Sequence, residues 1–513
     1  AVLRDGRNLL AFSPDRYDVM ISQPAEPWIN GATDLYTREF FALAASRLNE
    51  GGIFCQWIQL YAIDADSVAI LLNTFQQTFK DTFVFHPHGA GEILLVGYKD
   101  RLDEHGQRVT AKIDVAKLAD CFRQPDIARA LHYQGLYRAE DILSMLLLTP
   151  ENVERFCQKI LSRRTASRLN TDSNLLTEYW LPWQVFSGGS SIETNVAELR
   201  KFSSDFADCL ANFGKQPADR AALLTDVALS LLRYHQKFPY ELLDEQALAF
   251  AYEAWKLSGD PAMRAACDAI SYRAGRLNQP DSAIVYDGKE ASWQLSFWTA
   301  EKLIARGKVK EALEPLLNAA KAMPQRADLW TRLGQVYVDE RQNEKAYKAF
   351  GAAISADADY VPALTGMSDA LFRAGEWQEA ADFARKALTV TANEYRARFL
   401  LAKSLIELGK TDEANWQMQW AQKAAPYDRT PTLFIAGHQA LSGKFALAES
   451  NLQQLMKHAP GDKRAFLVAC VVLSGQGKAD EAKKAIQSYG DKSLFEASPD
   501  LIKERLREVL INL

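Results

Sequence analysis

From residue 293 onward the sequence repeats with a period of 34 residues, and this regularity constrains the fold more than any other feature. Windows that start at 293, 327, 361, 395, 429 and 463 all carry alanine at their twentieth position. Five of the six windows also share a glycine column: Gly307, Gly375, Gly409, Gly443 and Gly477. Because small residues are needed where paired helices cross, the period predicts stacked helical hairpins. Six units exceed the roughly three that such a stack needs for stability.

The window at 327 identifies the type of hairpin. It carries a set of residues at the spacing of the tetratricopeptide repeat (TPR) family, which it resembles: Trp330, Leu333, Gly334, Tyr337 and Phe350. The resemblance implies an all-α TPR solenoid over residues 293–513, closed by a C-terminal capping helix over 499–513. Residues 195–292 are also helical by pattern, and we interpret them as degenerate repeats of the same kind.

The first hundred residues follow a different pattern, in which strands and helices alternate. The predicted strands are 17–22, 53–58, 82–86 and 92–98, the last two as an antiparallel pair, and the predicted helices are 35–48 and 64–80 with a turn at 49–52. The first strand ends at Gln23 and feeds a helix through a loop. Open α/β sheets bind their ligands at such a carboxyl edge.

Residues 17–41 have a composition specific enough to suggest a family. They resemble the central motif of the spermidine synthase (aminopropyltransferase) family, in the branch that is fused to membrane segments, and 169–172 with Glu178 and Tyr179 resemble a later segment of that branch. The resemblance implies a partial methyltransferase-like (Rossmann-type) α/β domain over 1–186, followed by a linker at 187–194 that is rich in Gly and Ser. The family's glycine-rich first turn is absent, so we interpret the chain as the carboxyl part of a longer protein.

The resemblance also implies site residues around the first strand. Where the family has a catalytic Asp this chain has Gln23, and where it has a second acid this chain has Glu26. A neutral amide cannot act as the base that takes a proton from the attacking amine, so Gln23 marks a degenerate position. Glu26 either retains part of that carboxylate function or is a solvated loop acid. Gln56 matches a substrate-side Gln of the family, although an ordinary residue at the edge of the sheet fits equally well.

Further pocket residues follow from the same resemblance, each with a structural alternative. Asp5 falls where the family contacts the adenine of its nucleotide co-substrate, but an Asp before Gly is also a common turn residue. Trp28 and Tyr36 are predicted pocket walls, or else aromatic residues of the core. His88 stands where the family has Tyr. A metal site would need further ligands at a suitable spacing, and the sequence does not supply a full set there. We therefore expect His88 to be structural and expect no metal.

The repeats present a second candidate surface. Four apolar side chains fall at positions that face the groove of a TPR array, with Arg396 and Lys403 nearby: Phe297, Phe372, Phe399 and Ile406. An apolar groove predicts a helix or an extended peptide as the protein partner, or else packing against the chain's own first domain.

Composition excludes several classes of function. The formal net charge of −5 gives no basis for nucleic-acid binding, which needs a clustered basic face. The six cysteines form no CxxC pair, which argues against a zinc site and a disulfide framework. No apolar run is long enough to span a membrane, so any membrane segment is expected in a missing N-terminal part.

These observations predict a catalytically degenerate spermidine synthase-like domain coupled to a TPR scaffold. The expected protein is membrane-associated, with the cytoplasmic side favoured over the periplasmic side, and it binds protein partners through the TPR groove without a cofactor. The alternative is an active aminopropyl or methyl transferase acting on an amine. That enzyme would use S-adenosylmethionine or its decarboxylated form, with Glu26 in place of the lost base.

Overall fold

The computed structural model places the chain in two compact units, which are described separately. It describes residues 5–29, 31–163, 167–187, 190–203, 206–211, 216–237, 243–274, 292–424, 428–458, 461–494 and 497–512. The first unit comprises Ala1–Gln124 and Arg138–Tyr286, and the second comprises Pro125–Tyr137 and Asp287–Leu513. Residues 275–291, at the end of the predicted degenerate repeats, lie outside the described residues.

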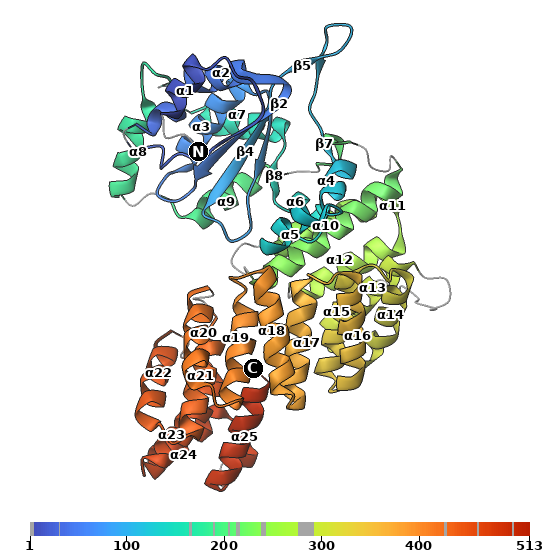
Figure 1. Cartoon of the computed structure of the whole chain (residues 1–513), viewed down its shortest axis with the longest axis vertical. Coiled ribbons are helices and arrows are strands. Elements are labelled where there is room, and N and C mark those ends of the chain that lie inside the picture. Colours follow the sequence, from blue (N-terminus) through green and yellow to red (C-terminus); the bar gives the residue numbers. More distant parts are fainter. Residues whose placement is uncertain are drawn as a thin grey trace. The chain divides into compact units, whose positions relative to one another are not determined.

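The first unit is built on a five-stranded sheet (Figure 1). The strands, in their order across the sheet, are β1 (Tyr17–Ser22), β2 (Leu48–Gln59), β4 (Glu92–Tyr98), β3 (Asp81–Phe85) and β8 (Leu146–Leu148). The β1–β2 pair is parallel and the other pairs are antiparallel. The predicted antiparallel pair is therefore confirmed, with β3 and β4 joined by a short connection.

Two local predictions in this unit were wrong. The segment 49–52, predicted as a turn, belongs to the long strand β2, and the pairing register shifts between Tyr17 and Val19 to accommodate it. Such a bulge lets extra residues remain in a strand without a turn. The predicted helix over 35–48 is shorter than expected, because η1 (Thr33–Leu35) precedes it and Thr37 caps the start of α2 (Arg38–Arg47).

Helices that share one buried cluster with the sheet complete its core. They are α1 (Gly6–Phe12), α2, α3 (Ala65–Thr78), α7 (Pro150–Leu161), α8 (Leu176–Ser187) and α9 (Ile192–Arg200). Asp64 caps α3, as its sequence position suggests, by accepting a 2.8 Å hydrogen bond from the amide of Ser67. Helix α9 begins inside the predicted linker and contributes Val196 and Leu199 to the same buried cluster. The core of the first unit thus continues past residue 194.

The rest of the first unit is mainly helical. Its elements are β5 (Arg101–Leu102) with β6 (Arg108–Val109), β7 (Ile113–Asp114) with β9 (Leu210–Ala211), α4 (Val115–Cys121), α6 (Ala139–Leu143), η2 (Ala207–Cys209), α10 (Pro217–Lys237), α11 (Leu243–Ser258) and α12 (Pro261–Arg273). Helices α10 and α11 pack closely together, and α12 packs on α11. All six cysteines of the chain are free.

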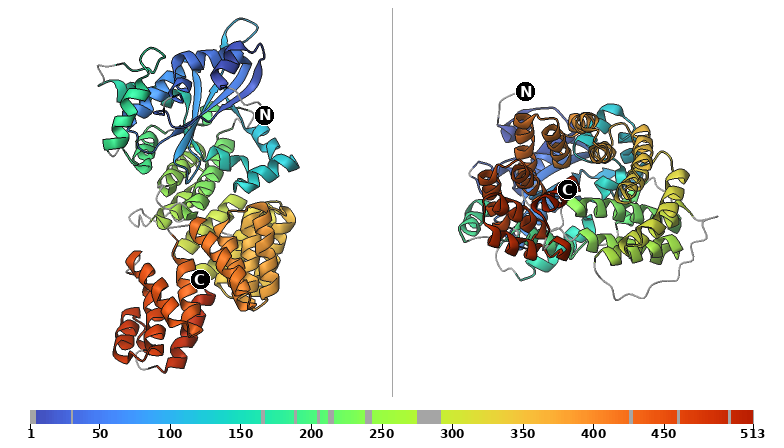
Figure 2. Two further views of the ribbon diagram at one scale, coloured as in Figure 1. Left: turned by 60° about the vertical axis from the view of Figure 1, so that its left-hand side comes forward. Right: turned by 90° about the horizontal axis from the view of Figure 1, so that it is seen from below.

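The second unit contains the repeat array as six helical hairpins (Figure 2). The first helices are α13 (Trp293–Ala305), α15 (Ala327–Asp339), α17 (Val361–Ala374), α19 (Tyr395–Glu407), α21 (Thr430–Leu441) and α23 (Lys463–Gly475). The second helices are α14 (Val309–Ala322), α16 (Asn343–Ala356), α18 (Trp377–Val390), α20 (Thr411–Ala424), α22 (Phe445–His458) and α24 (Ala479–Tyr489). The 34-residue register read from the sequence is confirmed.

Burial and backbone angles explain the two conserved columns of the period. The alanine column is buried where the helices of each hairpin cross: Ala312, Ala346, Ala380, Ala414, Ala448 and Ala482. The glycine column ends the first helix of five of the six hairpins with a positive φ, from 75° at Gly443 to 86° at Gly375, which glycine adopts without steric cost. In the second repeat the same position is occupied by Arg341, which has a φ of 56°.

Two further helices belong to the second unit. Helix α25 (Pro499–Ile511), predicted as a cap, packs against the first helices α21 and α23 of the last two repeats. Helix α5 (Pro125–Tyr133) comes from far upstream in the sequence and packs beside α18. The side chain of Tyr137, just after α5, joins the apolar clusters around Tyr360 and Val361.

Candidate functional site

The loop after β1 is held over the carboxyl edge of the sheet by Tyr36. Its phenol is buried and donates a 3.0 Å hydrogen bond to the backbone carbonyl of Ala25. Burial raises the pKa of Tyr36 above its ordinary value, with the nearby Glu26 carboxylate adding to the effect. Tyr36 therefore remains a neutral donor. It supports the loop from beneath, as the core alternative for this residue expects, and does not form an exposed pocket wall.

The side chain of Glu26 lies near aromatic residues at this edge of the sheet. The hydroxyl of Tyr61 donates a 3.1 Å hydrogen bond to Oε1 of Glu26. The indole of Trp28 meets the Tyr61 ring edge to face, with 6.1 Å between centroids. Burial, and then the hydrogen bond to Glu26, raises the pKa of Tyr61. The sequence analysis missed Tyr61, although its place just beyond the end of β2 was a signal for it.

Gln56 reaches the same cluster from β2, where it pairs with Ser22 at the end of β1. Its side chain is fully buried, and its Nε2 donates to the Trp57 carbonyl at 3.3 Å. The Tyr36 hydroxyl lies 3.5 Å from the same carbonyl. The Oε1 of Gln56 has no hydrogen-bond partner among the described residues. Gln23, by contrast, is exposed just after β1. Glu26, Tyr61, Tyr36 and Gln56 thus form one cluster with a buried acceptor available, which we call the edge cluster.

His88 belongs to a different network. Its Nε2 lies 3.0 Å from the Ser144 hydroxyl, and its ring lies 4.7 Å from that of Tyr234. Ser144 in turn donates to the backbone carbonyl of Asp141, a buried acid that accepts a 2.7 Å hydrogen bond from Ser230 and pairs with Arg233. These contacts tie α6 to α10, which fits the structural alternative for His88.

Asp5 acts as a helix cap. Its carboxylate accepts a 2.7 Å hydrogen bond from the amide of Asn8 at the start of α1. Arg7 in the same helix donates to the backbone carbonyl of Asp34 at 2.9 Å and pairs with Asp172. These contacts are those of the turn alternative for Asp5, and they connect α1 to the segment around residue 172.

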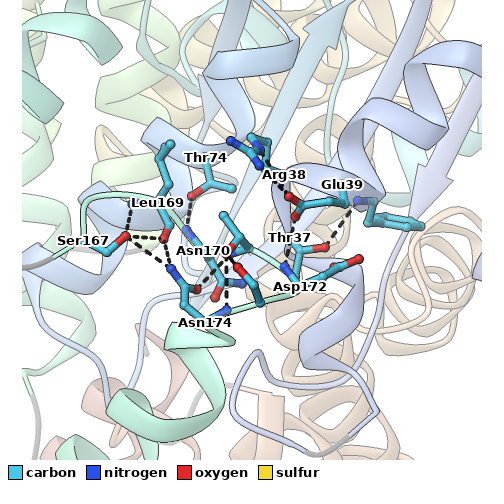
Figure 3. Close-up of polar contacts among 12 residues, drawn as sticks. Thr37, Arg38, Glu39, Thr74, Ser167, Leu169, Asn170, Asp172 and Asn174 are labelled. Carbon is cyan, nitrogen blue, oxygen red and sulfur yellow. Dashed lines mark hydrogen bonds and ion pairs between the residues drawn. The ribbon is translucent and has the colours of Figure 1, made fainter.

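Hydrogen bonds hold the 169–174 segment against Glu39 of α2 and Thr74 of α3 (Figure 3). Asn170 donates through Nδ2 to the Tyr36 carbonyl at 3.0 Å and accepts at Oδ1 from the amide of Thr177 at 3.1 Å. Its own amide donates to the Thr74 hydroxyl at 2.9 Å. The amide of Asp172 donates to Glu39 at 2.9 Å. Although burial opposes ionisation, the hydrogen bonds from Arg7 and Thr37 hold the pKa of Asp172 below its usual range.

The inner surface of the solenoid centres on Lys403. Its ammonium lies over three phenylalanine rings, 4.4 Å from the centroid of Phe372, 5.4 Å from Phe399 and 5.5 Å from Phe434. Its side chain is fully buried, and burial lowers the pKa of Lys403 to about 8, against the opposing attraction of Asp369. We call these four residues the lysine cage.

The other predicted groove residues are distributed along the array. Arg396 is exposed, and its Nη2 lies 3.9 Å from Asp369. Ile406 is partly buried and packs against two apolar clusters of the later repeats. Phe297 is buried in the first repeat against Trp298, with 5.1 Å between ring centroids. Phe372 and Phe399 therefore converge on one site with Lys403, whereas Phe297 does not.

The described part of the chain also bears on metal binding and on membrane crossing. It contains no group of three or more His, Cys, Asp or Glu side chains placed to hold a metal ion. None of the helices there combines the length and the apolar character that crossing a membrane requires.

Comparison with known proteins supports the helical half of this description. Residues 327–360 match the family model described as tetratricopeptide repeat. The second unit is a TPR-like solenoid. The spermidine synthase resemblance has no support among these comparisons, and no curated protein matches the chain.

Solved structures of TPR proteins are also similar to this chain. A tetratricopeptide repeat protein from Parabacteroides merdae is 16% identical, with 53% of this chain and 99% of that one covered and a TM-score of 0.39. PilF from Pseudomonas aeruginosa is 17% identical over 42% of this chain and 97% of that one, with a TM-score of 0.34. PilW, a type IV pilus biogenesis factor, is 18% identical over 42% and 98%, with a TM-score of 0.36.

Proposed function

We propose that this chain is a scaffold that binds a protein partner through the inner surface of its TPR-like solenoid. The observation that carries the proposal is the lysine cage, where a fully buried cation is kept in the solenoid by Phe372, Phe399 and Phe434. A buried ammonium is costly unless acceptors or aromatic faces compensate it, and TPR packing alone does not need one. A site for a carbonyl-bearing ligand does need one, and the Lys403 ammonium already donates to such a carbonyl, that of Ile511 in the chain's own C-terminal helix, at 3.3 Å.

Partner retention on the full chain tests this function. Arg396 is exposed beside the cage, so Arg396→Glu reverses a charge of the surface without disturbing the core. Arg385 on α18 is a matched control, because it is also partly exposed and pairs with an acid. We expect a defined partner to be retained by the wild type and by Arg385→Glu, and lost with Arg396→Glu. Equal retention by all three proteins would argue against the inner surface.

In the same proposal the first unit is a spermidine synthase-like domain that has lost aminopropyl transfer. The strand order β1–β2–β4–β3 supports a partial methyltransferase-like sheet, and the exposed, neutral Gln23 supports loss of the catalytic base. The edge strand β1 exposes 56% of Val19 and 77% of Ile21. Because alternate side chains of a strand lie on the same face of the sheet, this exposed apolar face favours a further element packed against it.

Association with a membrane is part of this proposal as well. The membrane-fused branch of the resembled family suggests it, on the cytoplasmic side. Helix α8 supports it, because Tyr179 and Trp183 there are each 73% exposed, and Trp and Tyr favour the membrane interface.

A second candidate function, an amine-binding transferase, is favoured by the edge cluster. The unpaired Oε1 of Gln56 and the carboxylate of Glu26 are both acceptors, which is what an ammonium or amine ligand requires. In aminopropyl transfer the amine nitrogen would attack the propyl carbon of decarboxylated S-adenosylmethionine. The C–S bond would break, the thioether would leave, and Glu26 would take the amine proton.

Calorimetric titration with putrescine and with decarboxylated S-adenosylmethionine separates the two functions. If the transferase is active, the wild type binds both ligands and turns them over, and Glu26→Gln abolishes turnover. The exposed Glu50 provides the control, since Glu50→Gln should change nothing. Absence of binding and of turnover in the wild type would leave the scaffold as the sole function.

A further inference from the structure

Helix α25 has the features of a bound ligand. Its apolar stripe, Ile502, Leu506 and Leu510, recurs every four residues, as on one face of a helix, and is buried. The stripe packs on α21 and α23, which are the first helices of their repeats and also pack on each other. The opposite face, with Glu504 and Arg507, is exposed. The helix therefore lies on the solenoid through one apolar stripe, as an amphipathic helix lies in a groove.

The surface beneath α25 is shaped to receive it. Gly437 of α21 lies directly under Leu510: a Cβ at this position would come within 2.7 Å of a Leu510 methyl group. Any side chain at residue 437 would therefore require the Leu510 side chain to shift. The last carbonyl groups of a helix lack partners within the helix, and they need donors from elsewhere.

Two earlier repeats of the solenoid supply donors to this end of α25. Lys403 of α19 donates to the backbone carbonyl of Ile511 at 3.3 Å, and Arg373 of α17 donates to the side-chain oxygen of Asn512 at 2.7 Å. Both cations meet the carboxyl end of α25, which carries the negative end of the helix dipole. A helix that merely capped the array would need contacts with the last repeat only. This one reaches the third and fourth repeats.

We infer that α25 is a built-in ligand of the solenoid, and that the same site takes an amphipathic helix of a protein partner, whose carboxyl end would meet Lys403 and Arg373. The inference rests on the proposed scaffold function and adds the class of partner and its regulation. The partner would bind after α25 is released.

A peptide of residues 498–513, labelled with a fluorophore and added to the full chain, tests the inference. In the wild type α25 competes with the peptide, so binding should be weak. In the double variant Leu506→Asp/Leu510→Asp the helix should leave its site, and the peptide should bind at least tenfold more tightly. Leu501→Asp is the matched control, because Leu501 is an exposed leucine of the same helix and this variant should behave as the wild type.

Two further measurements make the result unambiguous. Adding Lys403→Met to the double variant should remove most of the gain in peptide affinity. Hydrogen exchange should show lost protection in 499–511 of the double variant, with α17 and α19 still protected. The inference is overturned if the peptide fails to bind the folded double variant, if the whole solenoid loses protection, or if α25 is only exchanged between two copies of the chain.

The peptide titration and the partner retention experiment can fail independently. Peptide binding without retention of any partner would support the self-docked helix and refute the scaffold function. Retention of a partner that depends on Arg396, without any gain in peptide affinity in the double variant, would support the scaffold and refute the role of α25.

Discussion

The hydroxyl of Thr391 donates a 2.9 Å hydrogen bond to the backbone carbonyl of His132, although the two residues are 259 positions apart in the sequence. Thr391 ends α18, and Asp357, which ends α16 exactly one period earlier, lies 3.8 Å from the His132 ring nitrogen. Helix α5 is thus held by equivalent residues of two successive repeats, each at the end of the second helix of its hairpin. The ring of Tyr137 then packs on that of Tyr360, with 4.5 Å between centroids.

Thr391→Val should loosen α5. The substitution keeps the shape of the side chain but removes one of the two hydrogen bonds that the His132 carbonyl accepts, the other coming from the amide of Gly135 at 2.8 Å. Loss of one such bond costs about 0.5–1.5 kcal/mol. Amide hydrogen exchange across 126–133 should accelerate accordingly. Thr389→Val is the control, since the exposed Thr389 hydroxyl bonds only to the Lys386 carbonyl of its own helix. Unchanged exchange in Thr391→Val would show that α5 does not depend on this hydrogen bond.

Arg341→Gly should stabilise the second repeat. Arg341 occupies the column that is glycine in the other five repeats, with a φ of 56° that costs a side-chain-bearing residue about 1–2 kcal/mol. Part of that gain is lost because glycine gains entropy in the unfolded chain, so we expect a net gain of roughly 0.5–1 kcal/mol in the free energy of unfolding. Denaturant unfolding measures the change. Gly375→Ala, at φ 86° in the next repeat, should have the opposite effect, and a loss of stability in Arg341→Gly would contradict this account.

The pH dependence of stability should report the lysine cage. Burial lowers the pKa of Lys403 from 10.5 to about 8, so between these values the unfolded chain binds the proton that the folded chain has released. Folding stability should therefore rise as the pH increases from about 8 to about 10.5, by up to about 1.4 kcal/mol per unit. Below pH 8 the cost of the buried charge is fully present, lessened by Asp369 and Glu407 and increased by Arg373 and Arg396.

Lys403→Met removes the titration of Lys403. Comparison of this variant with the wild type therefore separates the contribution of Lys403 to the pH dependence of stability from that of all other groups. Denaturation of the wild type and of the variant at a series of pH values should give a difference in free energy that changes across this window. The exposed Lys386 supplies the control, since Lys386→Met should follow the wild type throughout. A constant difference between the wild type and Lys403→Met would mean that the ammonium is not buried in solution.

The elements that could be predicted from the sequence are those set by local periodicity. The alanine column fixes the hairpin register because each alanine lies at a helix crossing, and the alternating apolar run of 92–98 specifies β4. The positions at which α5 and α25 pack on the repeats could not be predicted in this way. Contacts such as Lys403 with Ile511, and Thr391 with His132, join residues more than 100 positions apart. Nothing in a local pattern encodes which partner satisfies a helix end.

The edge cluster likewise combines residues that could be predicted from the local pattern with residues that could not. The strand and the loop that carry Glu26 follow from the local pattern, whereas its partner Tyr61 lies beyond the next strand and becomes a neighbour only through parallel β1–β2 pairing. The structural alternatives weighed for Asp5 and Tyr36 match their observed contacts, because short-range capping and core burial are the commoner roles of such residues. Whether Glu26 or Gln56 binds a ligand stays a prediction.

Asn170→Asp should uncouple the 169–174 segment from the edge cluster. The substitution removes the donor to the Tyr36 carbonyl and places a carboxylate in a fully buried position, so we expect a loss of about 2–4 kcal/mol in the free energy of unfolding of the first unit. The charged form is the one that burial disfavours, so the loss should shrink as the pH falls and the new carboxyl is protonated. The same change at Asn343, the first residue of α16, should be neutral or slightly stabilising, because a negative charge is favourable at the start of a helix. Chemical denaturation at pH 7 and pH 5 measures both effects. A variant that is as stable as the wild type at pH 7 would show that Asn170 does not hold Tyr36, and with it the loop of Glu26, in place.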